Sequence, residues 1–234
     1  MIKKKTFVTQ NTKKYKKIIN IINNYKISKF ELISNYGLYS GDTNLFKTLT
    51  IYDIVKRIKN IKGDIIEFGV WKGNTSFLIK KILDVYKIKK KIYLFDHFKG
   101  LIHFTKNDSK KGLIFRNKYI GNKKLIKEII KFFNFKKIYI IDKDATKLTE
   151  KCFTGKKFSL VIMDVDLYEP SIKILNSIEK NLSRKGLIVF DEGNSKIWSG
   201  EKKAMDNFLK KYEKKYKKEF IPYARQPDVI LKKI

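Results

Sequence analysis

The chain has 234 residues, of which 43% are hydrophobic, and this suits a single α/β domain with a full core. It has no run of about 18 apolar residues, and no apolar segment follows its basic start, so we predict neither a membrane-spanning helix nor a secretory signal and expect a cytoplasmic protein. Cys152 is the only cysteine, which excludes an intrachain disulfide and a thiolate metal site.

The formal net charge of +31 would attract anionic partners, nucleic acid among them. Only four of the 54 basic residues are arginine, and the other 54 − 4 = 50 are lysines spread along the whole chain. Nucleic-acid readers favour arginine for recognition of phosphate and guanine, and no RRM, KH or helix-turn-helix signature accompanies the charge. We therefore treat nucleic acid as an unfavoured partner, while the sequence leaves a homo-oligomer open.

Residues 1–45 are polar and lysine-rich, and their one amphipathic stretch, from Tyr15 to Tyr25, predicts a helix. The turn-rich segment 35–42 predicts a loop, in which Tyr36 and Tyr39 are candidates for closing over a ligand. We divide the chain into an N-terminal helical cap or lid, residues 1–45, and a main domain, residues 46–234.

In the main domain, apolar runs typical of strands alternate with stretches of helical periodicity. Strands are expected at 65–70, 91–95, 137–141, 158–163 and 186–190, and a closing pair at 220–223 and 229–232. Helices are expected at about 45–59, after Gly73, at 122–134, from Pro170 to Ser183, and at 202–217, with an irregular insertion at 99–121. The pattern predicts a Rossmann-like sheet that is mostly parallel, has an antiparallel C-terminal edge and carries helices on both faces.

Two acidic clusters follow neighbouring strands of this sheet. Asp164-Val-Asp-Leu-Tyr-Glu-Pro170 comes after one strand and Phe190-Asp-Glu192 after the next. The carboxyl ends of parallel strands are where open α/β sheets bind ligands, and carboxylates that converge there repel one another unless a cation lies among them. Oxygen ligands favour Mg²⁺, Ca²⁺ or Mn²⁺ over zinc. Asp164 and Asp166 are two residues apart, so one can hold the metal while the other takes a proton.

A glycine-bearing turn, Glu67-Phe-Gly-Val-Trp-Lys-Gly-Asn-Thr75, joins the first strand to its helix. The helix N-terminus can receive an anion, and Asp96 at the end of the second strand is placed for ribose hydroxyls. An NAD-dependent oxidoreductase is one interpretation, but Trp71 stands where the second glycine of the dinucleotide motif should be. Because Glu67 suits an amino group better than a pyrophosphate, the turn favours S-adenosylmethionine.

These motifs, with Phe95-Asp-His-Phe-Lys-Gly-Leu101 and the segment Trp198–Phe208, resemble the macrocin O-methyltransferase family from about residue 45 to the C-terminus. That family contains magnesium-dependent sugar O-methyltransferases of macrolide and aminocoumarin biosynthesis. The resemblance implies a class I methyltransferase fold, S-adenosylmethionine, a divalent cation and a sugar or glycosylated small molecule as the methyl acceptor. Two departures are Glu192, where many relatives have an aspartate, and the lack of a C-terminal histidine, which leaves the acceptor open.

The resemblance also assigns site residues by position. The metal ligands would be Asp164, Asp191 and Glu192, and the general base would be Asp166. The cofactor site would comprise Glu67, Gly69, Gly73, Thr75 and Asp96, and Asp144 after the third strand is a candidate for the adenine edge.

Each assignment has a structural alternative. Asp191 and Glu192 could cap a helix or form salt bridges with lysine, Asp166 could cap the helix near Pro170, and Asp96 could cap its own loop. His97 and His103 flank the acidic edge, although loop histidines are usually just solvated. The alternative from another class is a basic nucleic-acid-binding module that retains the fold without the activity.

Overall fold

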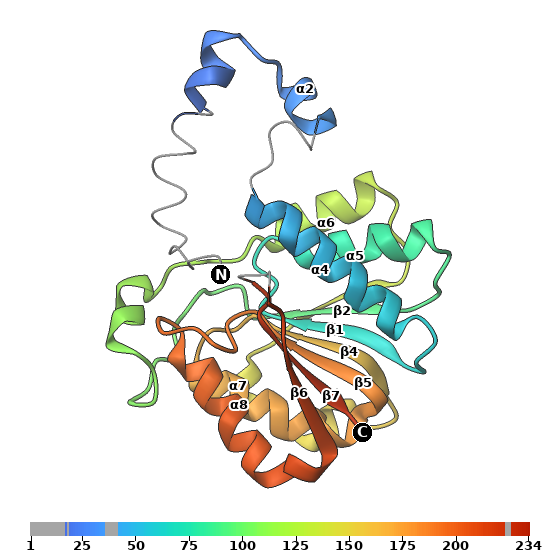
Figure 1. Ribbon diagram of the computed structural model, residues 1–234, viewed down its shortest axis with the longest axis vertical. Coiled ribbons are helices and arrows are strands. Elements are labelled where there is room, and N and C mark those ends of the chain that lie inside the picture. Colours follow the sequence, from blue (N-terminus) through green and yellow to red (C-terminus); the bar gives the residue numbers. More distant parts are fainter. Residues whose placement is uncertain (1–16, 18, 36–41, 223–225) are drawn as a thin grey trace. The chain divides into compact units, whose positions relative to one another are not determined.

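The computed structural model describes residues 17, 19–35, 42–222 and 226–234 (Figure 1). The chain divides into two compact units, residues 1–46 and 47–234. In the first unit, residues 19–24 are helical, which confirms the helix predicted there for its described part. A second helix, α2 (Lys29–Ser34), follows, and its N-cap Ser28 accepts a hydrogen bond from the Glu31 amide. Tyr36 and Tyr39 lie outside the described residues, so their part in a lid stays a prediction.

The second unit contains a seven-stranded sheet in the order β3-β2-β1-β4-β5-β7-β6. The strands are β1 (Asp64–Phe68), β2 (Ile92–Asp96), β3 (Ile138–Asp142), β4 (Phe158–Met163), β5 (Leu182–Phe190), β6 (Tyr216–Phe220) and β7 (Val229–Lys233). β1 to β5 pair in parallel, and β7 is antiparallel to both β5 and β6. The predicted fold class, a mostly parallel sheet with an antiparallel C-terminal edge, is confirmed.

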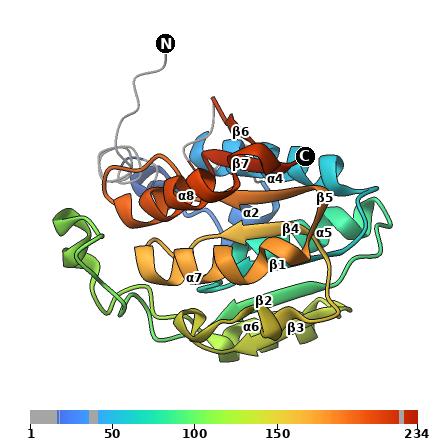
Figure 2. The same cartoon turned by 90° about the horizontal axis from the view of Figure 1, so that it is seen from below.

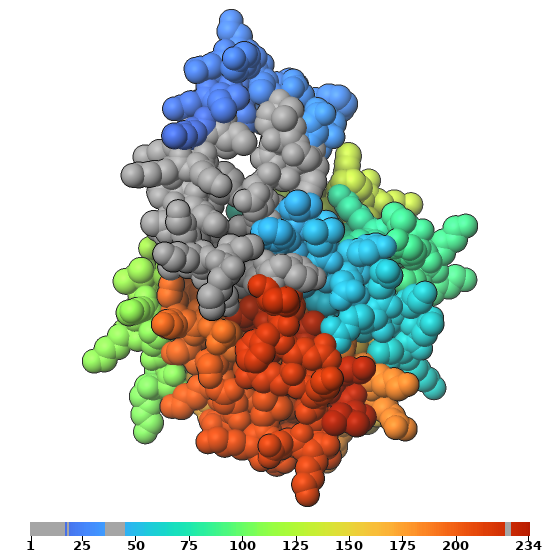
Figure 3. Space-filling model, in the orientation of Figure 1, coloured from blue at the N-terminus to red at the C-terminus, as the bar shows by residue number. Residues whose placement is uncertain are grey.

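Helices cover both faces of this sheet (Figures 1 and 2). They are α4 (Asp42–Ile58), α5 (Asn74–Val85), α6 (Lys123–Phe132), α7 (Tyr168–Ile178) and α8 (Ser199–Tyr212). Buried residues of α4, α5 and α6 share one apolar cluster with the sheet, and buried residues of α7 and α8 share the other. On the side seen in Figure 3, the outer surface of this unit is formed largely by α4 and by the C-terminal segments from α8 onward.

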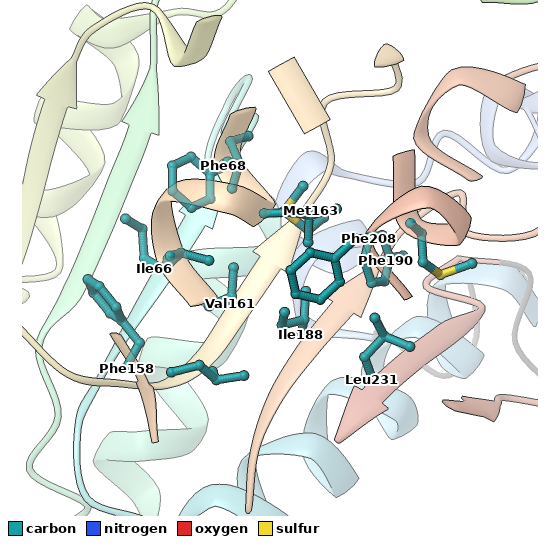
Figure 4. Packing of buried hydrophobic residues seen from close by; sticks show 14 of the residues in the cluster. Ile66, Phe68, Phe158, Val161, Met163, Ile188, Phe190, Phe208 and Leu231 are labelled. Atoms are coloured by element: carbon teal, nitrogen blue, oxygen red, sulfur yellow. The ribbon is translucent and has the colours of Figure 1, made fainter. Parts of the chain in front are cut away.

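Successive side chains along each strand point to opposite faces of the sheet and so belong alternately to the two apolar clusters. Ile66 and Phe68 of β1 point toward α7 and α8, whereas Ile65 points toward α4 and α5. Figure 4 shows how Phe68, Met163 and Phe190 pack with their neighbours on the α7–α8 side. Each large apolar side chain buried in this way contributes roughly 1.5–3 kcal/mol to folding. The core therefore holds the strand ends, and the residues that follow them, in fixed positions.

The C-terminal boundaries differ from those predicted. The helix expected to reach residue 217 ends at Tyr212, a 3₁₀ turn η5 (Glu213–Lys215) follows, and β6 begins at Tyr216 instead of Phe220. The reason is tertiary, because Tyr216 is buried and packs with a ring-centroid distance of 5.2 Å against Phe208. A lysine-rich stretch with helical propensity thus becomes an edge strand.

Short 3₁₀ segments occupy the connections. They are η1 (Lys110–Phe115), η2 (Ala145–Lys147), η3 (Glu150–Phe153) and η4 (Glu179–Asn181). The first lies in the predicted irregular insertion. Among the described residues, no helix combines the length and the apolar character needed to cross a membrane.

Candidate functional site

The strand register aligns the ends of β1, β2, β4 and β5. Phe68 pairs with both Phe95 and Met163, and Met163 pairs with Phe190. The next residues along these strands are therefore level with one another: Gly69, Asp96, Asp164 and Asp191. From β1 the strand order runs through β2 to β3 on one side, and from β4 it runs to β5 on the other. The row therefore lies at the switch point between β1 and β4, where open α/β sheets bind ligands.

The glycine turn after β1 touches the acidic cluster directly. Gly69 has φ +83°, and a Cβ there would lie 1.8 Å from the Asp164 carbonyl oxygen. Glycine is required because the backbones of β1 and β4 meet at this point. Gly73 is the N-cap of α5 and Thr75 is buried in its first turn, with no side chain capping that helix end. The cofactor roles of Gly69, Gly73 and Thr75 stay predictions.

Glu67 is buried beneath this turn, with 1% of its surface exposed. Its Oε2 accepts a hydrogen bond from the Ser76 hydroxyl in α5. Burial raises the pKa of Glu67 to about 7, although the Ser76 bond and the charge of Lys47 act in the opposite direction. A cationic amino group placed here would stabilise the ionised form.

Asp96 ties the end of β2 to the glycine turn. Its Oδ2 accepts hydrogen bonds from the amides of Val70 (2.8 Å) and Trp71 (2.9 Å), and its Oδ1 accepts one from Phe98 (2.7 Å). The loop-capping alternative is therefore observed. Because each carboxylate oxygen has two lone pairs, Oδ1 can accept a further donor, and the ribose role stays a prediction.

The predicted metal ligands lie together at the ends of β4 and β5. Asp191 and Glu192 are each 5% exposed. Burial, together with the charge of Asp191, raises the pKa of Asp164 well above its usual range. Within the described part of the chain, however, no three histidine, cysteine, aspartate or glutamate side chains are arranged as a metal-binding group.

A lysine that the sequence did not single out enters this cluster. Lys47 of α4 places its Nζ 3.3 Å from Asp191 Oδ1. Burial lowers the pKa of Lys47, but the charges of Asp191 and Asp164 outweigh burial and hold it above its usual range. The lysine salt bridge considered for Asp191 is thus present. Among 50 lysines, no local signal distinguished this one.

Asp166 does not cap the helix that follows it. The N-cap of α7 is Leu167, which makes no side-chain capping bond, and the Tyr168 amide instead donates to Asp108 Oδ1 at 2.8 Å. Asp166 has φ +62°. Burial and the charges of Asp164 and Glu201 raise the pKa of its carboxyl well above the usual range. The helix-cap alternative is wrong, and the base role stays a prediction.

Asp144 and the two histidines form a separate group at the end of β3. Asp144 Oδ1 accepts hydrogen bonds from the amide and hydroxyl of Thr146, and its Oδ2 lies 3.0 Å from His103 Nε2. Burial alone would raise the pKa of Asp144, but the Thr146 bonds and His103 lower it. His97 and His103 are in ring contact, with centroids 5.7 Å apart. These contacts are all within the protein, so the adenine contact of Asp144 stays a prediction.

Aromatic rings connect the insertion to this sheet edge. Tyr119 packs edge-on against Trp71 of the glycine turn at 6.3 Å, and Phe115 packs against Trp198, before α8, at 5.1 Å. Trp71 and Tyr119 remain 43% and 45% exposed. This edge of the sheet therefore carries a glycine turn, a buried acidic cluster and two partly exposed aromatic rings.

Comparison with known proteins identifies the family. The model of the macrocin-O-methyltransferase (TylF) family matches residues 46–220. Among curated protein sequences, none matches this chain significantly.

Solved structures share the fold. The calicheamicin methyltransferase CalS11 is similar with a TM-score of 0.77 and 20% identity, over 95% of this chain and 92% of that one. The O-methyltransferase NovP gives a TM-score of 0.68 and 17% identity, over 81% and 80%. The S-adenosylhomocysteine-bound methyltransferase PaMTH1 of Podospora anserina gives 0.51 and 15%, over 81% and 76%. The sheet is thus that of class I methyltransferases, and the chain belongs to the macrocin-O-methyltransferase family and is an O-methyltransferase.

Proposed function

We propose that this protein transfers the methyl group of S-adenosylmethionine to a hydroxyl of a sugar or glycosylated small molecule, with Mg²⁺ or another hard divalent cation bound nearby. The observation that carries the proposal is the contact between Gly69 and the Asp164 carbonyl. It sets the glycine turn beside the acidic cluster, so a cofactor on one and an acceptor on the other would be neighbours.

The cofactor would lie along the glycine turn. The uncapped N-terminus of α5, after Gly73, offers amide groups to the methionine carboxylate, and buried Glu67 offers an acceptor to its amino group. Asp96 would accept the ribose hydroxyls. When bound, the cofactor supplies an electrophilic methyl group on sulfur.

Asp164, Asp191 and Glu192 would hold the cation. Their oxygen donors suit Mg²⁺, and their burial among like charges favours a divalent ion. Lys47 Nζ lies 3.3 Å from Asp191 Oδ1, so a cation bound to that oxygen would take the place of this pairing. A bound cation lowers the pKa of a chelated hydroxyl and fixes its orientation.

Asp166 would accept the proton of the acceptor hydroxyl. The raised pKa of its carboxyl makes the ionised form a stronger base than an ordinary aspartate. Asp166 would take the proton that the acceptor hydroxyl loses while its oxygen bonds to the methyl carbon in place of sulfur, so that S-adenosylhomocysteine would be the leaving group. Proximity and orientation supply the rest of the rate enhancement.

Two observations support a sugar as the acceptor. The related fold of CalS11 belongs to a TDP-rhamnose 3'-O-methyltransferase, and the matching family is named for macrocin O-methylation. In this chain, the partly exposed rings of Trp71, in the glycine turn, and Tyr119, which packs against it, offer apolar surfaces. Such rings can pack against the apolar face of a sugar while its hydroxyls point to the carboxylates.

Calorimetric titration tests the cofactor assignment. We expect S-adenosylhomocysteine to bind and NAD not to bind. Asp96→Ala removes acceptors for ribose that are worth roughly 1.5–3 kcal/mol each and also frees the glycine turn, so affinity should fall by at least about tenfold. Asp142→Ala, a change at an exposed aspartate ending the neighbouring strand, is the control and should leave affinity unchanged. If the two variants bind S-adenosylhomocysteine with equal affinity, Asp96 does not contribute to the cofactor site.

A further inference from the structure

Glu201 links the two loops that carry the acidic cluster. It lies in the first turn of α8 and is 0% exposed. Its Oε2 accepts a hydrogen bond from the Asp166 amide (3.2 Å), and its Oε1 accepts one from the Glu192 amide (3.1 Å). The Glu201 amide also donates to the Asp166 carbonyl oxygen at 3.3 Å. One carboxylate therefore joins the loop after β4 to the loop after β5.

The local sequence allows this close approach. A Cβ at Gly200 would lie 1.9 Å from Asp108 Oδ1 and 2.6 Å from the Tyr168 amide nitrogen, so only glycine lets the start of α8 reach the β4 loop. The N-terminus of α8 carries a partial positive charge, and its N-cap, Trp198, makes no side-chain bond. Both the helix end and the two amides favour a carboxylate at this position.

The cost of this arrangement indicates a functional reason for it. Burial and the charges of Asp164 and Asp191 raise the pKa of Glu201 well above its usual range, so another carboxyl among these groups is unfavourable for folding alone. An amide side chain of the same shape would relieve the repulsion. It would place an NH₂ group against one of the two backbone amides, however, and could accept only the other bond.

We propose that Glu201 is a positioning residue that sets the spacing between Asp166 on one loop and Glu192 on the other. The inference rests on the proposed function in one respect, namely that these side chains serve a cation and a proton transfer. Glu201 acts through the backbone of the loops and does not touch the reacting atoms. Lys47 borders the cluster from the α4 side of the sheet and Glu201 from the α8 side.

The test compares Glu201→Gln with Glu179→Gln. Glu179 is also a buried carboxylate, 4% exposed, but it pairs with Lys233 (3.2 Å) and Lys215 (3.5 Å) where the chain enters β5, at the opposite end of that strand from Glu192. Glu179→Gln loses its ion pairs with Lys215 and Lys233, and Glu201→Gln loses one of its two backbone hydrogen bonds, so a melting curve is recorded for both variants. Only Glu201→Gln should affect the acidic loops.

Two readouts separate positioning from general destabilisation. Hydrogen exchange of the Asp166 or Glu192 amide should become roughly tenfold faster in Glu201→Gln at matched stability, because one of the two bonds that these amides donate to Glu201 is lost. Titration with Mn²⁺ alone should show an affinity about 10–100-fold weaker, the usual effect of losing an outer support of a metal site. Glu179→Gln should change neither.

The outcomes are distinct. If both amides exchange as slowly in Glu201→Gln as in Glu179→Gln, the proposal is overturned. It is also overturned if the loops exchange faster while Mn²⁺ affinity stays the same. If the unmodified protein binds no Mn²⁺ but Glu201→Gln alone accelerates exchange, the proposed metal site fails and the positioning role of Glu201 is supported.

Discussion

Asp191→Asn is expected to reduce methyl transfer by at least about 100-fold at ordinary Mg²⁺ concentrations. Asp191 is 5% exposed and lies with Asp164 at the strand ends, so its carboxylate is central to the proposed cation site. Loss of an outer support alone costs 10–100-fold in metal affinity, and loss of a direct ligand should cost at least as much. Measuring rate against Mg²⁺ concentration should show a curve displaced to higher concentration.

Two controls accompany this variant. S-adenosylhomocysteine affinity should stay within a few-fold, since Asp191 does not belong to the glycine turn. Asp142→Asn, at the exposed end of β3 where the side chain pairs with Lys123, should leave the Mg²⁺ dependence unaltered. An Asp191→Asn enzyme with the normal rate and Mg²⁺ curve would show that this residue serves only the Lys47 salt bridge.

Asp166→Asn is expected to lower the catalytic rate by roughly 10²–10⁴-fold with Michaelis constants nearly unchanged. The loss corresponds to about 3–5 kcal/mol of transition-state stabilisation. The fold should tolerate the change, because asparagine readily adopts the positive φ of this position and the bond from its amide to Glu201 is retained. Steady-state kinetics and a melting curve together measure both effects.

The pH profile gives a second readout for Asp166. Only the ionised carboxylate can accept a proton, and the pKa of Asp166 is raised by burial first and by its carboxylate neighbours next. The rate of the unmodified enzyme should therefore fall at low pH, as Asp166 takes up a proton and can no longer accept one from the acceptor hydroxyl. In Asp166→Asn this limb should vanish, and hydroxide should restore part of the rate at high pH. A variant with the unmodified profile at every pH would exclude the base role.

Much of the fold followed from local pattern. The bounds of β4 were predicted to the residue, because its six positions are all buried and turn residues flank the run. The prediction failed where tertiary contacts decide, as at β6, whose Tyr216 is held by Phe208. Lysine-rich segments carry little periodic signal, so their boundaries depend on what they pack against.

The site was predictable where it follows strands and not where it depends on packing. Asp96, Asp164 and Asp191 stand directly at strand ends, and parallel register alone places them in one row. Lys47 and Glu201 come from helices on opposite faces of the sheet. They bond Asp191 and Glu192 in the loop after β5, from which they are 144 and 9 residues away in the sequence. The pairing Gly200-Glu201 in the Trp198–Phe208 motif was the one available sequence signal.

For two residues of the site, the structure shows a contact within the protein where the sequence suggested a contact with a ligand. Gly69 was predicted to belong to the cofactor site, yet the contact that requires glycine there is with the Asp164 carbonyl. Asp96 was expected to face ribose, and its carboxylate already holds the amides of Val70 and Trp71. Both residues shape the site whether or not they touch a ligand, so each variant must be read with a stability control.

Transfer of a labelled methyl group tests the central claim most directly. The protein would be incubated with S-adenosylmethionine labelled in its methyl group, and with either a pool of nucleotide-linked and glycosidic sugars or total RNA, in Mg²⁺ or in EDTA. We expect label in the sugar pool with Mg²⁺, almost none in EDTA, recovery when Mg²⁺ is restored, and none in RNA. Label appearing in RNA, or transfer to sugar that continues undiminished in EDTA, would contradict this account.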